Sequence, residues 1–214
     1  MSWRISIVVV WVAIFLGGCT TDIRHAENVP LIRSGGEMKV ALDEVSKITV
    51  GPIERAELGE ALTPQDEKDL RRASRLLQGV VKFQPDNYLA HFALGQIHYA
   101  LGDYVVAIAA LSECPKRAPD KLEGTSKETV ARAFYLMSQS YIQVGAWEEA
   151  DKAIEDAIKL VPISSDYFTG LAATKIQLKQ YDKARAALEQ ALKLEPDHYK
   201  ATSLKRLLIQ EKKW

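Results

Sequence analysis

Apolar residues between positions 63 and 214 recur at the three- and four-residue spacing of amphipathic helices. Residues 88–119 show the pattern well, with small or apolar side chains at Ala90, Leu94, Ile97 and Leu111. A Gly-Asp break at positions 102–103 divides this stretch in two. The pattern therefore predicts two helices joined by a tight turn.

Recurring alanines and prolines indicate that this helix pair is repeated. A proline follows twelve residues after each of four alanines, giving the pairs Ala73 and Pro85, Ala107 and Pro119, Ala150 and Pro162, and Ala184 and Pro196. Successive pairs are 34, 43 and 34 residues apart. A period of this size is typical of stacked supersecondary units, so the chain is expected to present an extended surface to partners.

The residues around these markers resemble the tetratricopeptide repeat. The first unit has Leu94-Gly95, the turn glycine Gly102 and the aromatic Tyr104, and the second has Gly145 followed by Trp147. The resemblance implies an all-α, right-handed superhelical solenoid of antiparallel helix pairs. It divides the chain into a half repeat at 63–87, repeats at 88–119, 126–162 and 163–196, and a capping helix at 197–214.

Nine extra residues separate the first and second units. Pro115 has no backbone donor, so it is expected to end its helix near Cys114. Residues 115–128 are then expected to form a loop, closed by a capping box of Thr125 and Glu128.

The later units also depart from the family pattern. Met137-Ser138 replaces Leu-Gly in the second unit. In the third unit Lys179 replaces the turn glycine and Lys175 replaces a tyrosine. The register of the remaining residues keeps both units recognisable as repeats.

Helices that flank the repeats are expected to close both ends of the stack. Thr63, Pro64 and Asp66 form a strong helix start for the half repeat. Asp197 is expected to cap the last helix. The residues of that helix expected to face inward are Tyr199, Ala201, Leu204, Leu207 and Leu208.

Residues 19–62 are expected to be a tether or spacer with little regular structure. The stretch from Val40 to Val50 is apolar enough for a short helix or a strand, and a spacer that packs partly against the first helices is the favoured interpretation. Disorder is the alternative.

The N-terminus resembles a bacterial lipoprotein signal. Arg4 precedes an apolar run from Ile5 to Leu16, too short to span a bilayer, and Leu-Gly-Gly leads to Cys19. The resemblance implies removal of residues 1–18 and acylation of Cys19, for example with palmitate. Thr20 does not match the aspartate of inner-membrane retention, which favours the outer membrane facing the periplasm. An ordinary secretory peptide is the alternative.

Charge and cysteine content fit a single domain without a nucleic-acid partner. The chain has 28 basic and 28 acidic residues, and loss of residues 1–18 removes only Arg4. This balance predicts no polyanion binding. With Cys19 lipidated, Cys114 has no partner for a disulfide and is expected in the core.

No catalytic constellation is apparent. His91 and His98 are seven residues apart and so share one face of a helix. Both occupy positions where the repeat usually has packing aromatic residues. No Cys, Asp or Glu stands at a spacing that would complete a metal site with them. The chain is therefore expected to be no enzyme, with no catalytic residue, metal or cofactor, and no small-molecule substrate.

In this family the first helix of each pair lines a concave groove. The corresponding residues here are Leu89, Phe92, Gln96 and Tyr99 in the first unit and Arg132, Tyr135, Gln139 and Ile142 in the second, followed by Asp166, Thr169, Ala173 and Ile176 in the third. An apolar segment of an envelope protein is the expected ligand. The alternative is that residues 37–62 fill the groove.

These expectations describe a membrane-anchored protein-protein interaction scaffold. The favoured partner belongs to a secretion or pilus assembly system of the cell envelope. The alternative is an adaptor or regulator of a peptidoglycan enzyme or an envelope protease. The sequence itself names no partner.

Overall fold

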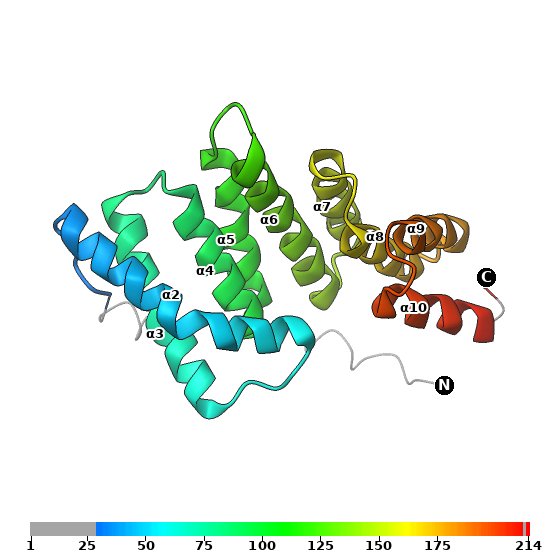
Figure 1. The fold of residues 1–214 in the computed structure, drawn as a ribbon, viewed down its shortest axis with the longest axis horizontal. Helices are drawn as coiled ribbons and strands as arrows, with labels where there is room; N and C mark the ends of the chain where they lie inside the picture. Colours follow the sequence, from blue (N-terminus) through cyan, green and yellow to red (C-terminus); the bar gives the residue numbers. More distant parts are fainter. Residues whose placement is uncertain (1–28, 212) are drawn as a thin grey trace, which may run out of the picture.

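The computed structural model describes residues 29–211 and 213–214, and these form a row of helices that follow one another along the long axis of the molecule (Figure 1). The bounds of the helices in this part of the chain are α2 Gly35–Leu58, α3 Pro64–Phe83, α4 Tyr88–Ala100, α5 Tyr104–Arg117, α6 Gly124–Gln143, α7 Trp147–Leu160, α8 Ser165–Gln177, α9 Tyr181–Leu194 and α10 Tyr199–Gln210. The fold is an all-α superhelix, as expected.

The recurring alanines hold the stack together. Ala73, Ala107, Ala150 and Ala184 are all fully buried. Each lies on the second helix of its pair, where only a small side chain lets the neighbouring helix approach. Gly95 is a second such point, because a Cβ there would lie 2.3 Å from Cγ of Leu111 on α5.

The three turns inside the repeats share one hydrogen-bonding pattern. The backbone N–H of Asp103, Ala146 and Gln180 donates to the carbonyl five residues earlier, at 2.8–2.9 Å. Gly102 and Gly145 supply the left-handed residue with φ of 76° and 77°. Lys179 adopts the same conformation at φ 58°, so the third turn keeps its geometry without glycine.

Residues 19–62 were expected to have little regular structure, and for residues 35–58 this is wrong. Helix α2 places Met38, Ala41, Val45, Thr49 and Pro52 along one side, and this side packs on α3 and α4. Gly51, Pro52 and the β-branched residues lower helix propensity, so the helix depends on this burial.

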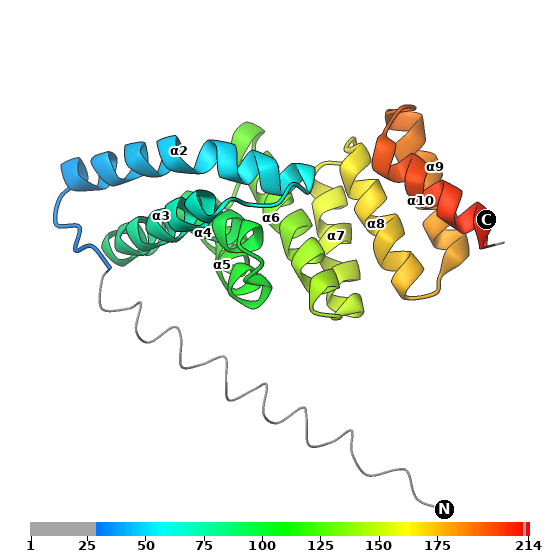
Figure 2. The same cartoon turned by 90° about the horizontal axis from the view of Figure 1, so that it is seen from below.

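Helix α2 completes the first pair of the array. It contacts α3 and α4, as α4 contacts α5 and α6, and as α6 contacts α7 and α8. The expected half repeat at 63–87 is therefore the second helix of a full pair. Figure 2 shows α2 lying along one side of the molecule above α3 and α4.

The junction between the first and second units differs from its prediction in two ways. Pro115 lies inside α5, which continues to Arg117, because a proline in the last turn costs only the bond to Leu111. The cap of α6 is Glu123, which forms a capping box with Ser126, and not Thr125 with Glu128. The loop is consequently short, and α6 has 20 residues where α4 and α8 have 13.

The caps predicted for α3 and for α10 have different outcomes. Thr63 and Asp66 form the expected capping box at the start of α3, with Pro64 in the first turn. The cap of α10 is His198, whose Nδ1 accepts from the backbone of Ala201, so the prediction of Asp197 was wrong. Tyr199 and Leu207, expected inward, are 70% and 43% exposed.

Candidate protein-binding surface

Of the twelve predicted groove residues, eight lie on two adjacent first helices, α4 and α6, and the four of the third unit lie on α8. We call the set of eight the α4–α6 face. Its members are Leu89, Phe92, Gln96 and Tyr99 on α4, and Arg132, Tyr135, Gln139 and Ile142 on α6. None of the eight is fully buried, and Leu89 is the most exposed apolar member at 51%.

Two aromatic members of the face pack more deeply than their predicted position implies. Phe92 and Tyr99 were placed opposite the packing stripe of α4, yet both pack against the core cluster that α5 and α6 share. Tyr99 also meets Tyr104 edge to face, with ring centroids 5.9 Å apart. Leu89 and Gln96 therefore form the outer surface of α4, with the two aromatic rings as its flank toward α6.

The other flank of α4 is covered by α2. Ala93, Ala100 and Leu101 belong to the core cluster that α2, α3 and α4 share. Residues 37–62, considered as an alternative occupant of the groove, thus mostly form α2 and pack beside α4. Leu89 stays half exposed in their presence.

A stacked pair of tyrosines joins the face to the third repeat. Tyr135 on α6 stacks on Tyr167 of α8, with ring centroids 5.1 Å apart and an interplanar angle of 28°. Burial raises the pKa of the Tyr135 hydroxyl, and the carboxylate of Asp166 raises it further. The ring is consequently a neutral, largely buried wall between α6 and α8.

Gly170 makes this stack possible. A Cβ at Gly170 would lie 3.1 Å from Nε2 of Gln139 and 3.2 Å from Cε2 of Tyr135. At Gly170, which the sequence did not single out, the side chains of α6 therefore lie against the backbone of α8 with no room for a larger residue. In the sequence, the only helical glycine that the repeat pattern marked as a packing position was Gly95, in the Leu-Gly motif of the first unit.

Charged groups gather at the α8 end of the face. Asp166 accepts a hydrogen bond from Nε2 of His198 at 3.1 Å. Because Nδ1 of His198 accepts from Ala201, Nε2 is the nitrogen that carries the proton in the neutral ring. Arg132 lies close enough to the Tyr135 and Tyr167 hydroxyls to lower their pKa against the effect of burial. The charged members of this surface thus lie on α6 and α8, and none of the four members on α4 is charged.

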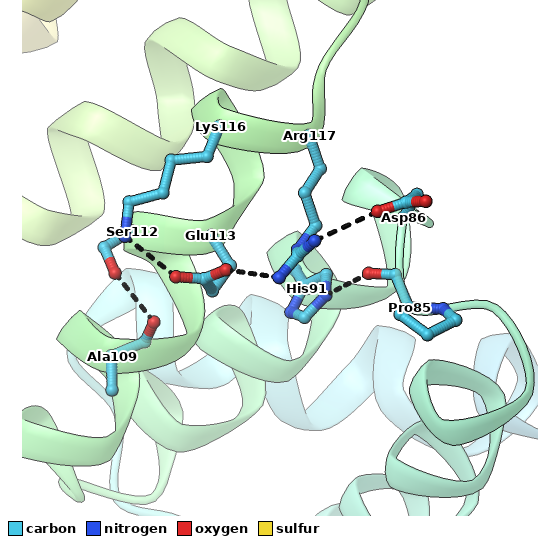
Figure 3. Close-up of polar contacts among 8 residues, drawn as sticks. All are labelled: Pro85, Asp86, His91, Ala109, Ser112, Glu113, Lys116 and Arg117. Atoms are coloured by element: carbon cyan, nitrogen blue, oxygen red, sulfur yellow. Dashed lines mark hydrogen bonds and ion pairs between the residues drawn. The ribbon is translucent and has the colours of Figure 1, made fainter.

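The two histidines of α4 have structural partners. Nε2 of His91 donates to the carbonyl of Pro85 at 2.9 Å and so fixes the loop before α4 (Figure 3). Arg117 of α5 ties the same loop to α5, because its guanidinium pairs with Asp86 of the loop at 3.0 Å and with Glu113 of α5 at 2.7 Å. His98 lies 3.0 Å from the Ser74 hydroxyl. Within the described residues no group of three or more His, Cys, Asp or Glu side chains is arranged to hold a metal.

Cys114 is fully buried on α5, as expected for a core residue. Burial raises the pKa of its thiol to about 12, so the thiolate is scarce at neutral pH. Cys19 and the signal at 1–18 lie outside the described residues. Among the helices of the described part, none has the length and apolar content needed to cross a membrane.

Comparison with known proteins agrees with this geometry. Two sequence profiles described as tetratricopeptide repeat match residues 58–121 and 165–198. The unmatched stretch between them holds α6 and α7, the unit with nine extra residues. No curated protein sequence matches the chain.

The following solved structures have a similar fold and are distant in sequence. A crystal structure of MamA protein superposes with a TM-score of 0.61 at 20% identity, covering 84% of this chain and 91% of that one. MamA from Desulfovibrio magneticus gives 0.54 at 19%, covering 78% and 99%. The Cut9–Hcn1 assembly of the APC/C gives 0.60 at 17%, covering 75% of this chain and 29% of that chain.

The fold and the α4–α6 face define a helical repeat array, a class of protein that presents side chains along a row of helices. The chain is a tetratricopeptide repeat protein. Such repeats are generally not enzymes, and the fold supports a protein-protein interaction scaffold.

Proposed function

We propose that this protein is a lipid-anchored scaffold of the bacterial cell envelope, and that its α4–α6 face binds an apolar segment of an envelope protein from a secretion or pilus assembly system. One observation carries the binding part. Leu89 is 51% exposed between two flanks of partly buried aromatic and small residues. An exposed leucine with packed surroundings suits a partner side chain inserted beside it.

The chemistry of the face also limits the ligand. Leu89 and the edges of Phe92 and Tyr99 offer apolar area on α4, whereas Gln139 on α6 offers an amide. A segment with an apolar residue toward α4 and a polar backbone or side chain toward α6 fits this order. The anchor rests on the Leu-Gly-Gly-Cys19 motif alone, and the outer membrane is proposed because Thr20 follows it.

Site-specific photo-crosslinking in cells tests the binding face. A photoreactive residue at Leu89 is expected to capture an envelope protein. The matched control is Val105, which is 71% exposed on α5 of the same repeat. Capture from position 105 with none from 89 contradicts the proposal. Leu89→Asp should lower partner recovery at least tenfold, and Val105→Asp should not.

The anchor has a separate test. The wild-type chain is expected to enter the detergent phase on phase separation and to incorporate labelled palmitate, whereas Cys19→Ser should do neither. A wild-type chain that stays in the aqueous phase contradicts the lipid anchor and leaves the binding face unaffected.

A further inference from the structure

A line of basic side chains runs along the outer side of α3. Lys68, Arg71, Arg75 and Lys82 are spaced three, four and seven residues apart, which places them on one side of the helix. Lys68, Arg71 and Lys82 are exposed and Arg75 is partly so. Among the acidic side chains that the structure describes, none pairs with any of the four.

The acidic side chains near this line bond to other residues or lie in the first turn of α3. Asp66 pairs with Arg55 of α2, and Asp69 accepts from Gln65. Glu44 of α2 pairs with Arg72 on the adjacent side of α3, at 2.5 Å. Glu67, in the first turn, flanks the line. Because the Gln65 amide is neutral, Asp69 keeps its negative charge, so Asp69 and Glu67 offset the four positive charges in part and leave an excess of positive charge on the line.

The other second helices carry no such line. On α5, Lys116 and Arg117 both pair with Glu113. On α9, Arg185 pairs with Asp182, and α7 has two glutamates in its first turn. The net charge of the chain is zero, so the positive surface of α3 is a local feature.

The N-terminal segment enters the fold beside this line. A Cβ at Gly79 would lie 2.6 Å from the carbonyl oxygen of Pro30, and Ile32 packs at the same point with 8% exposure. Gly79 lies between Arg75 and Lys82 on α3. In Figure 2 the blue segment before α2 leads down to α3.

The distance to the proposed anchor is short. Nine residues lie between Cys19 and position 29, the first described residue, so the ten Cα–Cα steps reach at most roughly 35 Å when fully extended. An acylated Cys19 would consequently hold α3 close to the bilayer. Electrostatic attraction acts over a Debye length of about 8 Å, so a basic line on this helix lies within range of the headgroups when the tether is compact.

We propose that the basic line of α3 binds anionic phospholipid headgroups and orients the array on the membrane. The inference rests on the proposed lipid anchor. Basic residues beside a lipid anchor are attracted to anionic headgroups, which gives the anchored domain a second contact with the membrane surface. Because α3 belongs to the row of second helices, this contact leaves Leu89 and the first helices available to a protein partner.

Vesicle flotation tests the contact without the acyl chain. The probe is the chain from residue 19 with Cys19→Ser, which keeps every described residue. It is expected to float with vesicles of phosphatidylethanolamine containing about a quarter phosphatidylglycerol, and at least tenfold less with phosphatidylcholine vesicles. High salt should abolish the binding.

Matched variants locate the binding surface. Replacing Lys68, Arg71, Arg75 and Lys82 by glutamine should reduce flotation at least tenfold. The control replaces four lysines elsewhere by glutamine, at Lys152, Lys183, Lys193 and Lys200, which changes net charge equally. Circular dichroism checks that both variants keep their helices.

Each outcome has one meaning. Loss of flotation in the α3 variant alone supports the inference. Equal loss in both variants indicates a net-charge effect and overturns the inference, as does a Cys19→Ser chain with all its basic residues intact that does not float. Since this chain carries no lipid, failure here is distinguishable from failure of the Cys19 anchor, which the palmitate experiment reports.

Discussion

Lys179 shows how one residue departs from the repeat at little cost to geometry. Its φ of 58° lies in the left-handed region, where glycine stands in the other two turns. A side chain in this conformation costs about 1–2 kcal/mol. Glycine removes that cost but loses about 0.4–1 kcal/mol more conformational entropy on folding. Lys179→Gly is therefore expected to raise the free energy of unfolding by about 0.5–1 kcal/mol in urea denaturation.

The control for Lys179 lies four residues later. Lys183→Gly places the same residue type in the exposed interior of α9. This change should lower the free energy of unfolding by about 0.5–1 kcal/mol. The same sign for both variants would contradict the conformational argument.

Asp66 links a helix cap to the packing of α2. Its carboxylate pairs with Arg55 and accepts from the backbone of Thr63, and these contacts lower its pKa from 3.8 to about 2. The folded pKa is the lower one, so the contribution to stability is complete above pH 5 and is lost as the pH falls toward 2.

Comparison of the wild type with Asp66→Asn over this pH range tests the linkage. The stability difference between the two, followed by circular dichroism in urea, should be largest at neutral pH and should shrink between pH 5 and 2. Arg55→Gln should weaken the pH dependence of the wild type as well. A difference that is constant from pH 7 to 3 contradicts the assignment.

At the scale of helices, Lys175 joins the second repeat to the third. This lysine replaces a tyrosine of the family pattern and is 5% exposed on α8. Its Nζ lies 2.7 Å from Oδ2 of Asp151 on α7 and 3.5 Å from Glu155. A buried ammonium without its partner is costly, whereas an apolar side chain of similar size is tolerated.

Substitutions at this junction should therefore be non-additive. Asp151→Ala is expected to lower the free energy of unfolding by about 1–3 kcal/mol, since Glu155 compensates only in part. In the Lys175→Met background the same change should cost less than about 1 kcal/mol. Equal costs in the two backgrounds would show that Asp151 acts through something other than Lys175.

Most of the helices could be predicted from periodicity, but α2 could not. The alanine-proline spacing and the turn residues identified α3 to α10 because those positions repeat. Helix α2 contains Gly51, Pro52 and many β-branched residues, and no repeated marker. Its conformation depends on burial against α3 and α4, which a single segment does not reveal.

The sequence predicted which residues lie on the candidate surface, but it did not predict how deeply each side chain is buried. Repeat register placed Leu89 and Tyr135 on adjacent first helices. It did not reveal that Phe92 and Tyr99 pack toward α6, or that Tyr135 stacks on Tyr167, because both depend on how closely successive helices approach. Gly170 sets that approach for α6 and α8.

For the molecule as a whole, stability in a linear array depends on neighbours, and the last repeat packs against a full repeat on one side and against α10 on the other. Trp214 packs against the core cluster of this repeat, and Nζ of Lys205 lies 4.7 Å from the centre of its ring. The aromatic ring thus covers apolar surface at the open end of the stack.

Removal of this ring should have a local effect. Trp214→Ala is expected to cost about 1–2 kcal/mol and to speed amide hydrogen exchange in α9 and α10. Protection of α3 and α4 at the other end should not change. Loss of protection throughout the chain would show that the array unfolds as one cooperative unit.

The greater length of α6 has a consequence for how any partner is aligned. At 20 residues, against 13 in α4 and α8, this helix extends about 10 Å beyond its neighbours, next to the loop seen at the upper edge of Figure 1. Identical repeats would let an extended ligand shift by one unit with little loss. A taller helix in the middle of the row removes that degeneracy, so the array offers a bound chain one register only.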